Sequence, residues 1–195
     1  MTLPSTYKQM ISTVSAEGEL TMELVDKPMP ELGEDEVLIR VEATPINPSD
    51  QGVMFGWASM AKATSSGSGK ETKLTAPVSP QGMGVMKARI GQALTVGNEG
   101  AGTVVAAGSG DYAQSLIGKV VAVMGGGMYA EYRKASAMMC LVLQDGHTAR
   151  DGASCFVNPL TALSMIETMR MEGHSALVHT AAASNLGQML NRICQ

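Results

Sequence analysis

The stretch Gly97-Asn98-Glu99-Gly100-Ala101-Gly102-Thr103-Val104-Val105-Ala106-Ala107-Gly108 decides the fold of this chain. Its valines and threonine are typical of a β-strand, and glycines interrupt it at positions 97, 100, 102 and 108. Glycine inside a strand marks a bulge, a tight bend or a close approach of another backbone or a ligand. The stretch therefore predicts a strand that turns tightly beside a site.

Short strands separated by turn residues surround this stretch. The pattern predicts a strand pair within Met10 to Val25 and further strands at Val37 to Ala43, within Leu94 to Ala107, at Lys119 to Met124 and at Met138 to Leu143. Turns rich in glycine stand between them, such as Gly125-Gly126-Gly127. Frequent short strands with such turns are typical of a rolled β domain.

Residues 55 to 95 differ in composition from their flanks. Ser65 to Lys70 has the composition of a linker, and Ala76 to Gly82 that of a turn. We expect a long irregular loop here, and two interpretations stay open, a functional lid and a disordered insertion.

The last part of the chain has the pattern of a helix, a strand and a second helix. Ala153 to Met171 is rich in alanine, leucine and methionine at helical spacing, and Gly173 is placed to end the helix. Ala176 to His179 predicts a short buried strand, and a turn of small residues then leads into a helix at Gln188 to Asn191. This is the order of elements that opens a dinucleotide-binding fold.

Composition excludes several classes of protein. Of the 195 residues 45% are hydrophobic and 16% are charged, and the net charge is −4, which argues against disorder and against a basic surface for nucleic acid. No window is apolar over the roughly 20 residues of a membrane helix, and the first residues lack the apolar stretch of a signal peptide. We expect a soluble cytoplasmic protein with no nucleic-acid or membrane partner.

The three cysteines, Cys140, Cys155 and Cys194, are odd in number and far apart. They form neither a disulfide framework nor a Cys-x-x-Cys pair. Their apolar surroundings predict reduced, buried thiols.

Five motifs, in their order along the chain, resemble those of the medium-chain dehydrogenase/reductase superfamily. They are Asn47-Pro48-Ser49-Asp50, the glycine-rich stretch at 97–108, Tyr129-Ala130-Glu131-Tyr132, Pro159-Leu160-Thr161-Ala162 and Ala182-Ala183-Ser184-Asn185-Leu186-Gly187. The branch that they resemble is the zinc-independent one, which contains NADPH:quinone oxidoreductases and enoyl-thioester reductases. The resemblance implies a mixed β and α/β fold, a GroES-like partly open β-barrel followed by the start of an incomplete Rossmann domain.

The resemblance covers nearly the whole chain except residues 55–95. It implies a GroES-like catalytic domain at 1–146, with the long loop inside it. Residues 147–195 would hold a connecting helix and the first β-turn-α unit of a truncated dinucleotide-binding domain. A chain that ends at Gln195 lacks most of such a domain, so we expect this fragment alone to be inactive.

The activity that the resemblance implies is NADPH-dependent reduction of a quinone, an enone or a related α,β-unsaturated carbonyl by hydride transfer without zinc. The full-length form would act on a small-molecule substrate as a homodimer. Three alternatives stay open: an enoyl-thioester reductase, a non-catalytic structural or interaction protein on the same fold, and an isolated GroES-like module without cofactor. Phe55 and Trp57 weaken the first, because they stand where those reductases keep a proton-donating tyrosine.

The turn at residues 182–187 fits the small-x-small-x-x-Gly form of the Rossmann fingerprint, in which small residues let the backbone approach a pyrophosphate at a helix N-terminus. Its candidate cofactor-binding residues are Ala182, Ser184, Asn185, Leu186 and Gly187. Ordinary close packing of strand and helix is the alternative, but the position between a predicted strand and a helix favours cofactor binding. The residue that would choose between NAD and NADP lies beyond Gln195.

Asn47 is the best candidate for a residue that both contacts the cofactor and takes part in catalysis. Without a Lewis acid, reduction depends on aligning the hydride with its acceptor and on hydrogen bonds that polarise the acceptor. An amide can donate to a carbonyl and accept from a carboxamide, and in the superfamily that this chain resembles the matching asparagine lies beside the nicotinamide. The alternative is a side chain that satisfies its own turn before Pro48, with Asp50 capping a helix start.

Five further side chains have competing interpretations. Tyr129 and Tyr132 are candidates for proton donation or substrate orientation, with packing on the domain face as the alternative for Tyr132. Thr161 matches a family threonine near the nicotinamide half of the cofactor, and its alternative is a helix hydroxyl that donates to a main-chain carbonyl. Glu99 is expected to be a buried carboxylate with a partner, and His179 a satisfied core histidine.

The sequence offers no ligand set for zinc. The zinc-dependent relatives place a cysteine near the position of Asn47 and a histidine at that of Asn98, and they add a lobe of four cysteines. Amides are poor zinc ligands beside thiolate and imidazole.

We therefore predict that the purified protein holds no stoichiometric zinc, since amides stand at both diagnostic positions. Elemental analysis measures the metal content directly. One equivalent of zinc per chain would overturn this prediction.

Overall fold

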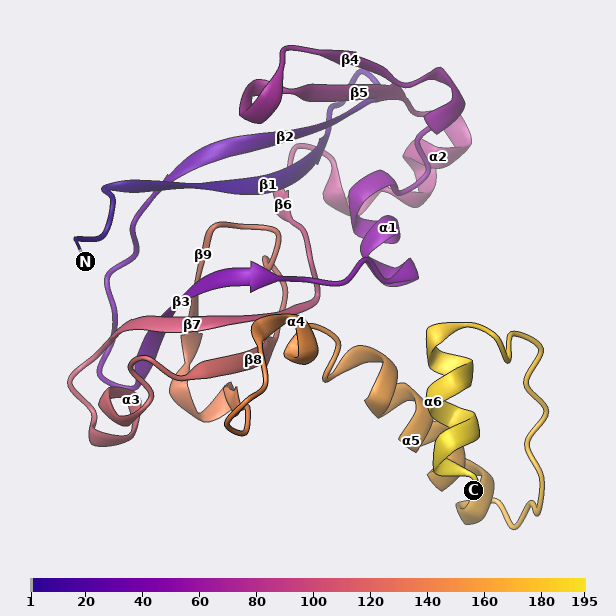
Figure 1. The fold of residues 1–195 in the computed structure, drawn as a ribbon. Coiled ribbons are helices and arrows are strands. Elements are labelled where there is room, and N and C mark those ends of the chain that lie inside the picture. Colours follow the sequence, from indigo (N-terminus) through magenta and orange to yellow (C-terminus); the bar gives the residue numbers. More distant parts are fainter. Residues whose placement is uncertain (1) are drawn as a thin grey trace.

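Two antiparallel five-stranded sheets form most of the computed structural model, which describes residues 2–195 (Figure 1). The first sheet has the order β4-β5-β2-β1-β6, with β1 at Thr6–Val14, β2 at Glu19–Pro28, β4 at Thr64–Ser66, β5 at Lys73–Pro77 and β6 at Leu94–Thr95. The second has the order β10-β8-β7-β3-β9, with β3 at Glu36–Ala43, β7 at Glu99–Ala107, β8 at Val120–Met124, β9 at Tyr132–Ser136 and β10 at Leu141–Val142.

Helices connect and follow the strands. They are α1 at Pro48–Phe55, α2 at Pro80–Val85, α3 at Asp111–Ser115, α4 at Ala149–Gly152, α5 at Val157–Met171 and α6 at Asn185–Ile193. Short 3₁₀ turns lie at Met60–Lys62, Gly69–Glu71, Lys87–Arg89 and Ala137–Met139. Within residues 2–195, every helix is too short or too polar to cross a bilayer.

The glycine-rich stretch forms β7, between β3 and β8. Its pairing with β3 shifts register twice along the strand. A Cβ atom at Gly102 would collide with the main-chain carbonyl of Arg40 on β3, so only glycine lets the two backbones pass this closely. The main buried cluster of the second sheet includes Val37, Ile39 and Val121.

The segment 129–131 joins the two sheets into a partly open barrel. The main-chain nitrogen of Met10 on β1 donates to the carbonyl of Tyr129 at 2.8 Å, and that of Glu131 donates to the carbonyl of Lys8 at 3.0 Å. These bonds confirm the predicted rolled β domain, because they bring the first sheet alongside the segment that leads into β9.

The segment 55–95 contains regular structure, so the prediction of an irregular loop was wrong. β4 and β5 extend the first sheet, and α2 follows them. The many serines and glycines of this segment suggested a loop, but the segment also contributes apolar side chains to a core. Val78 and Met86 pack with Val14 and Leu20. Burial of these side chains gives the segment a stable place in the fold.

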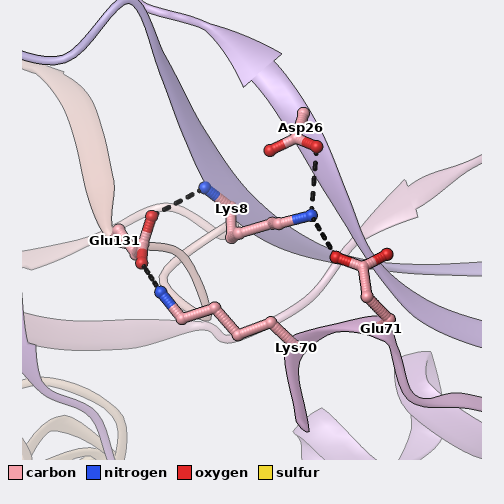
Figure 2. A network of polar contacts seen from close by, with 5 residues as sticks. All are labelled: Lys8, Asp26, Lys70, Glu71 and Glu131. Atoms are coloured by element: carbon pink, nitrogen blue, oxygen red, sulfur yellow. Dashed lines mark hydrogen bonds and ion pairs between the residues drawn. The ribbon is translucent and has the colours of Figure 1, made fainter. Parts of the chain in front are cut away.

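Five charged side chains fasten this segment to the rest of the barrel (Figure 2). Lys8 on β1 pairs with Asp26 at 3.0 Å and with Glu71 at 3.1 Å, and Lys70 pairs with Glu131. The bond from Lys70 lowers the pKa of Glu131, and the bonds to Asp26 and Glu71 raise the pKa of Lys8. Both groups therefore stay charged at neutral pH and hold the turn at Gly69–Glu71 against β1.

The C-terminal part differs from its predicted form in one element. α5 and α6 pack side by side through Ala162, Ile166 and Leu190 and extend away from the sheets (Figure 1). The strand predicted at Ala176 to His179 is absent, and Val178 is 91% exposed. A strand needs a hydrogen-bonded neighbour, and none of the strands described here lies beside this segment.

The three thiols occupy different environments. Cys140 is buried, and burial raises the pKa of its thiol to about 11. Cys155 is half-buried, but Cys194 is exposed near the end of α6, so the prediction that all three are buried was wrong for this residue.

We predict that Gly102→Ala lowers the free energy of unfolding by about 1–3 kcal/mol, because the new methyl group forces β3 and β7 apart. The matched control is Gly84→Ala in α2, where a Cβ meets open space, and it should change stability by less than about 1 kcal/mol. Chemical denaturation of both variants measures the difference. Equal midpoints would show that the two backbones can separate without cost.

Candidate functional site

The candidate site is built around Asn47, where the chain leaves β3 and enters α1. The side chain is 3% exposed. Pro48 occupies the first helical position, which suits its fixed φ, and the main-chain nitrogen of Asn47 donates to Oδ2 of Asp50 at 2.7 Å. The interpretation of Asp50 as a cap of the helix start is confirmed.

The amide of Asn47 bridges two distant elements in addition to its part in the capping box that closes its own turn. Its Nδ2 donates to Oε1 of Glu99 on β7 at 2.9 Å, and its Oδ1 accepts from Nδ2 of Asn158 on α5 at 3.3 Å. An amide nitrogen carries two hydrogens, and within residues 2–195 only one of them is used. The side chain is thus fixed in direction and keeps one donor for another group.

Glu99 is a buried carboxylate with partners, as predicted. It is 1% exposed, and its Oε2 accepts from the main-chain nitrogens of Phe156 at 2.8 Å and Val157 at 3.0 Å. These N–H groups are the free donors at the N-terminus of α5, where the helix dipole favours a negative charge. Glu99 therefore caps α5 and orients Asn47 with the same carboxylate.

Asp50 ties α1 to the loop before β7. Its side chain is 1% exposed, and its Oδ1 accepts from the main-chain nitrogen of Asn98 at 2.8 Å. The Nδ2 of Asn98 donates to the Ser49 hydroxyl at 2.9 Å. The two residues that stand at the positions of zinc ligands in the zinc-dependent relatives, Asn47 and Asn98, are both held by Asp50 through their main-chain nitrogens.

Tyr129 lies beside this group. Its hydroxyl donates to the carbonyl of Pro45 at 2.8 Å. Burial, reinforced by the charge of Asp50, raises the pKa of Tyr129 to about 12. The hydroxyl is therefore protonated at neutral pH and is a weak acid, which suits orientation better than proton donation.

The contacts of Tyr132 and Thr161 match the structural roles that were the alternatives to a role in the site. The ring of Tyr132 packs edge-on against Tyr7, with centroids 6.2 Å apart. The hydroxyl of Thr161 donates to the carbonyl of Val157 at 2.6 Å. Neither side chain has a hydrogen bond to Asn47 in the described structure, so both remain functional candidates only by their position.

Asn158 is the site residue that sequence reasoning missed. It lies in the first turn of α5, next to the Pro159-Leu160-Thr161-Ala162 motif, and contacts Asn47 across the start of the helix. Its position beside that motif is the only signal in the sequence, since an asparagine in a first helical turn is unremarkable by itself.

The turn at 182–187 lies at the N-terminus of α6. The Ser184 hydroxyl caps the helix by accepting from the nitrogen of Gly187 at 3.0 Å. Ala182, Ser184 and Asn185 are exposed, whereas Leu186 packs against the α5–α6 core. A Cβ at Gly187 would collide with the carbonyls of the turn, so this position requires glycine.

His179 is not the satisfied core histidine that the sequence predicts. Its Nε2 is buried and has no hydrogen-bond partner in the described part of the chain. It lies directly against Gly187, because the segment that carries it runs beside the turn as irregular chain and not as a strand.

The group around Asn47 and the turn each lie at the N-terminus of one helix of the α5–α6 pair. α6 runs alongside α5 in the same direction, so both helix N-termini lie at the end of the pair nearer the sheets (Figure 1). Asn47 and Glu99 lie at the first of these N-termini, and the turn forms the second. Among residues 2–195, no three His, Cys, Asp or Glu side chains cluster closely enough to hold a metal ion.

Comparison with known proteins gives one family and many related structures. The alcohol dehydrogenase GroES-like domain matches residues 33–145. No curated protein matches the chain significantly. A Mesorhizobium loti protein described as an NADPH:quinone reductase is 31% identical, with a TM-score of 0.66, and the match covers 97% of this chain and 52% of that one.

Two further structures share the fold. A Bacillus thuringiensis protein, also described as an NADPH:quinone reductase, is 23% identical over 96% of this chain and 49% of its own, with a TM-score of 0.65. Mycobacterial Rv1454c, solved in complex with NADPH, is 20% identical over 96% and 49%, with a TM-score of 0.59. The chain thus spans about half the length of these relatives.

The match to the GroES-like domain covers more than half of the chain. It confirms the predicted fold class, a GroES-like partly open β-barrel followed by the start of an incomplete Rossmann domain. The chain belongs to the alcohol dehydrogenase GroES-like domain family.

Proposed function

We propose that this chain, together with the rest of the fold that its relatives have, is an NADPH-dependent oxidoreductase that reduces a quinone, an enone or a related α,β-unsaturated carbonyl without zinc. The observation that carries the proposal is the buried amide of Asn47, held by Glu99 and Asn158 with one donor free. The relative described as an NADPH:quinone reductase supports this substrate class.

The chemistry divides between cofactor and protein. NADPH, when bound, supplies the hydride. Asn47 is fixed by two hydrogen bonds, so its remaining N–H is aimed in advance at a nicotinamide carboxamide or at the acceptor carbonyl. Tyr129 holds the loop that carries Asn47 through its bond to Pro45, and Tyr132 is retained as a candidate that orients substrate.

The turn at 182–187 and Thr161 are the proposed cofactor contacts. The residues present fit a pyrophosphate: Ala182, Ser184 and Asn185 are small and exposed at a helix N-terminus, where dipole and free N–H groups favour an anion. Rv1454c, a protein of the same fold, was solved with NADPH bound. Leu186 contributes by packing the turn onto α5.

The proposed organisation of the protein follows from these assignments. Residues 1–146 would form the catalytic domain, and residues 147–195 the connecting helix and the first unit of the cofactor domain. The complete protein would be a cytoplasmic homodimer that acts on a small molecule.

We predict that Asn47→Ala lowers turnover about tenfold to a thousandfold and weakens NADPH binding less, because the amide acts mainly in the transition state. The measurement is steady-state reduction of a quinone and an enone by a form with the complete cofactor domain. Asn191→Ala, an exposed asparagine of α6, is the matched control and should keep full turnover. Parental turnover in the Asn47 variant would make the amide a structural link only.

We also predict that Gly187→Leu weakens NADPH binding by about tenfold or more, because a side chain there pushes the carbonyls of the turn out of place. NADPH titration followed by calorimetry measures the change. Gly84→Leu, placed in open space on α2, is the control. Equal affinities for the two variants would contradict the assignment of the turn.

A further inference from the structure

A small cavity lies at the end of α1 opposite Asn47. Its volume is about 310 Å³, and it separates the C-terminal end of α1 from the segment of α2 and the turn at Lys87–Arg89. Trp57 and Val85 line it and are 55% and 59% exposed, so the cavity opens to solvent. The lining includes none of Asn47, Asp50 or Glu99, so this cavity is separate from the group around Asn47.

Arg89 contributes the only charge in the lining of this cavity. Its Nη2 donates to the Ser12 hydroxyl at 2.9 Å, and its Nε is buried without a partner. No carboxylate of residues 2–195 lies within salt-bridge distance of it, and burial lowers the pKa of its guanidinium. The cation is therefore partly desolvated and uncompensated, which is costly for a charged group.

Two glycines at the end of α1 line the cavity beside this cation. Gly52 lies in α1, Gly56 follows the helix as its C-cap with a φ of 52°, and both line the cavity. A Cβ at Gly56 would collide with the sulfur of Met86 and would lie 3.2 Å from Nη1 of Arg89, so only glycine fits between α1 and these side chains. At Gly52 a Cβ would meet nothing within 4 Å, so this side of the cavity is open.

We propose that this cavity binds a small carboxylate with a flat apolar body. The carboxylate accepts from the guanidinium of Arg89, whose planar donors match its two oxygens. The body lies against Trp57 and Val85, since an indole ring offers an apolar face to a flat group. A phosphate dianion fits less well, because no second cation lines the cavity.

A structural role for Arg89 is the competing explanation. Ser12 donates to the carbonyl of Met54 at 2.7 Å near the end of α1, so Arg89 could serve only to support that link. That role uses Nη2 alone and leaves the buried Nε without an acceptor among residues 2–195.

The test uses the fluorescence of Trp57, which is the only tryptophan in the chain. Benzoate is titrated into the 195-residue protein, with neutral benzamide as the matched ligand. We expect a saturable change in emission with a Kd on the order of 1 mM for benzoate, and binding of benzamide at least about tenfold weaker. No saturable change, or equal binding of the two ligands, would overturn the proposal.

Two pairs of variants separate recognition from folding. Arg89→Gln should weaken benzoate binding at least about tenfold, whereas Lys87→Gln, an exposed cation of the same turn, should not. Val85→Asp leaves Arg89 in place and adds a negative charge at the rim, so it should abolish binding that Val85→Asn retains. Equal binding within the Val85 pair would reject the carboxylate site even if the Arg89 variant fails to fold.

Discussion

The buried carboxylate of Glu99 is the interaction on which the rest of the site depends. It accepts hydrogen bonds from Asn47 and from the first free N–H groups of α5, so one side chain joins β7, the start of α1 and the connecting helix. A buried charge costs several kcal/mol without such partners. Because Oε1 of this carboxylate binds Asn47 and Oε2 binds the start of α5, the position of α5 helps to set the direction of the Asn47 amide.

α1 places two chemically different groups at its two ends. Its N-terminal end carries Asn47 and Asp50, which are fixed by β7 and its preceding loop. Its C-terminal end lines a cavity together with Arg89. The segment 55–95 supplies that second end, and its apolar side chains and the ion pairs around Lys8 hold it to the first sheet.

Local sequence patterns predicted several helices and strands correctly. The glycine-rich stretch, the strand pair around Gly18 and the helix that ends before Gly173 all appear close to their predicted places. The errors have a common cause. Residues 64–77 form strands because an existing sheet accepts them, and Ala176 to His179 does not because no described strand lies beside it. Composition alone does not report the presence of a hydrogen-bonding neighbour.

The sequence by itself determined the family, the fold class and the candidates Asn47, Glu99 and Tyr129, because motif order and glycine positions are local properties of the chain. Only the tertiary structure decided which of them are hydrogen-bonded to one another. Asn47 and Glu99 are separated by 52 positions, and Asn47 and Asn158 by 111, yet they share hydrogen bonds. Such contacts depend on where the backbone brings distant residues together. They therefore produce no periodicity or spacing in the sequence from which they could be predicted. The same holds for the guanidinium of Arg89, which has no ion pair among residues 2–195.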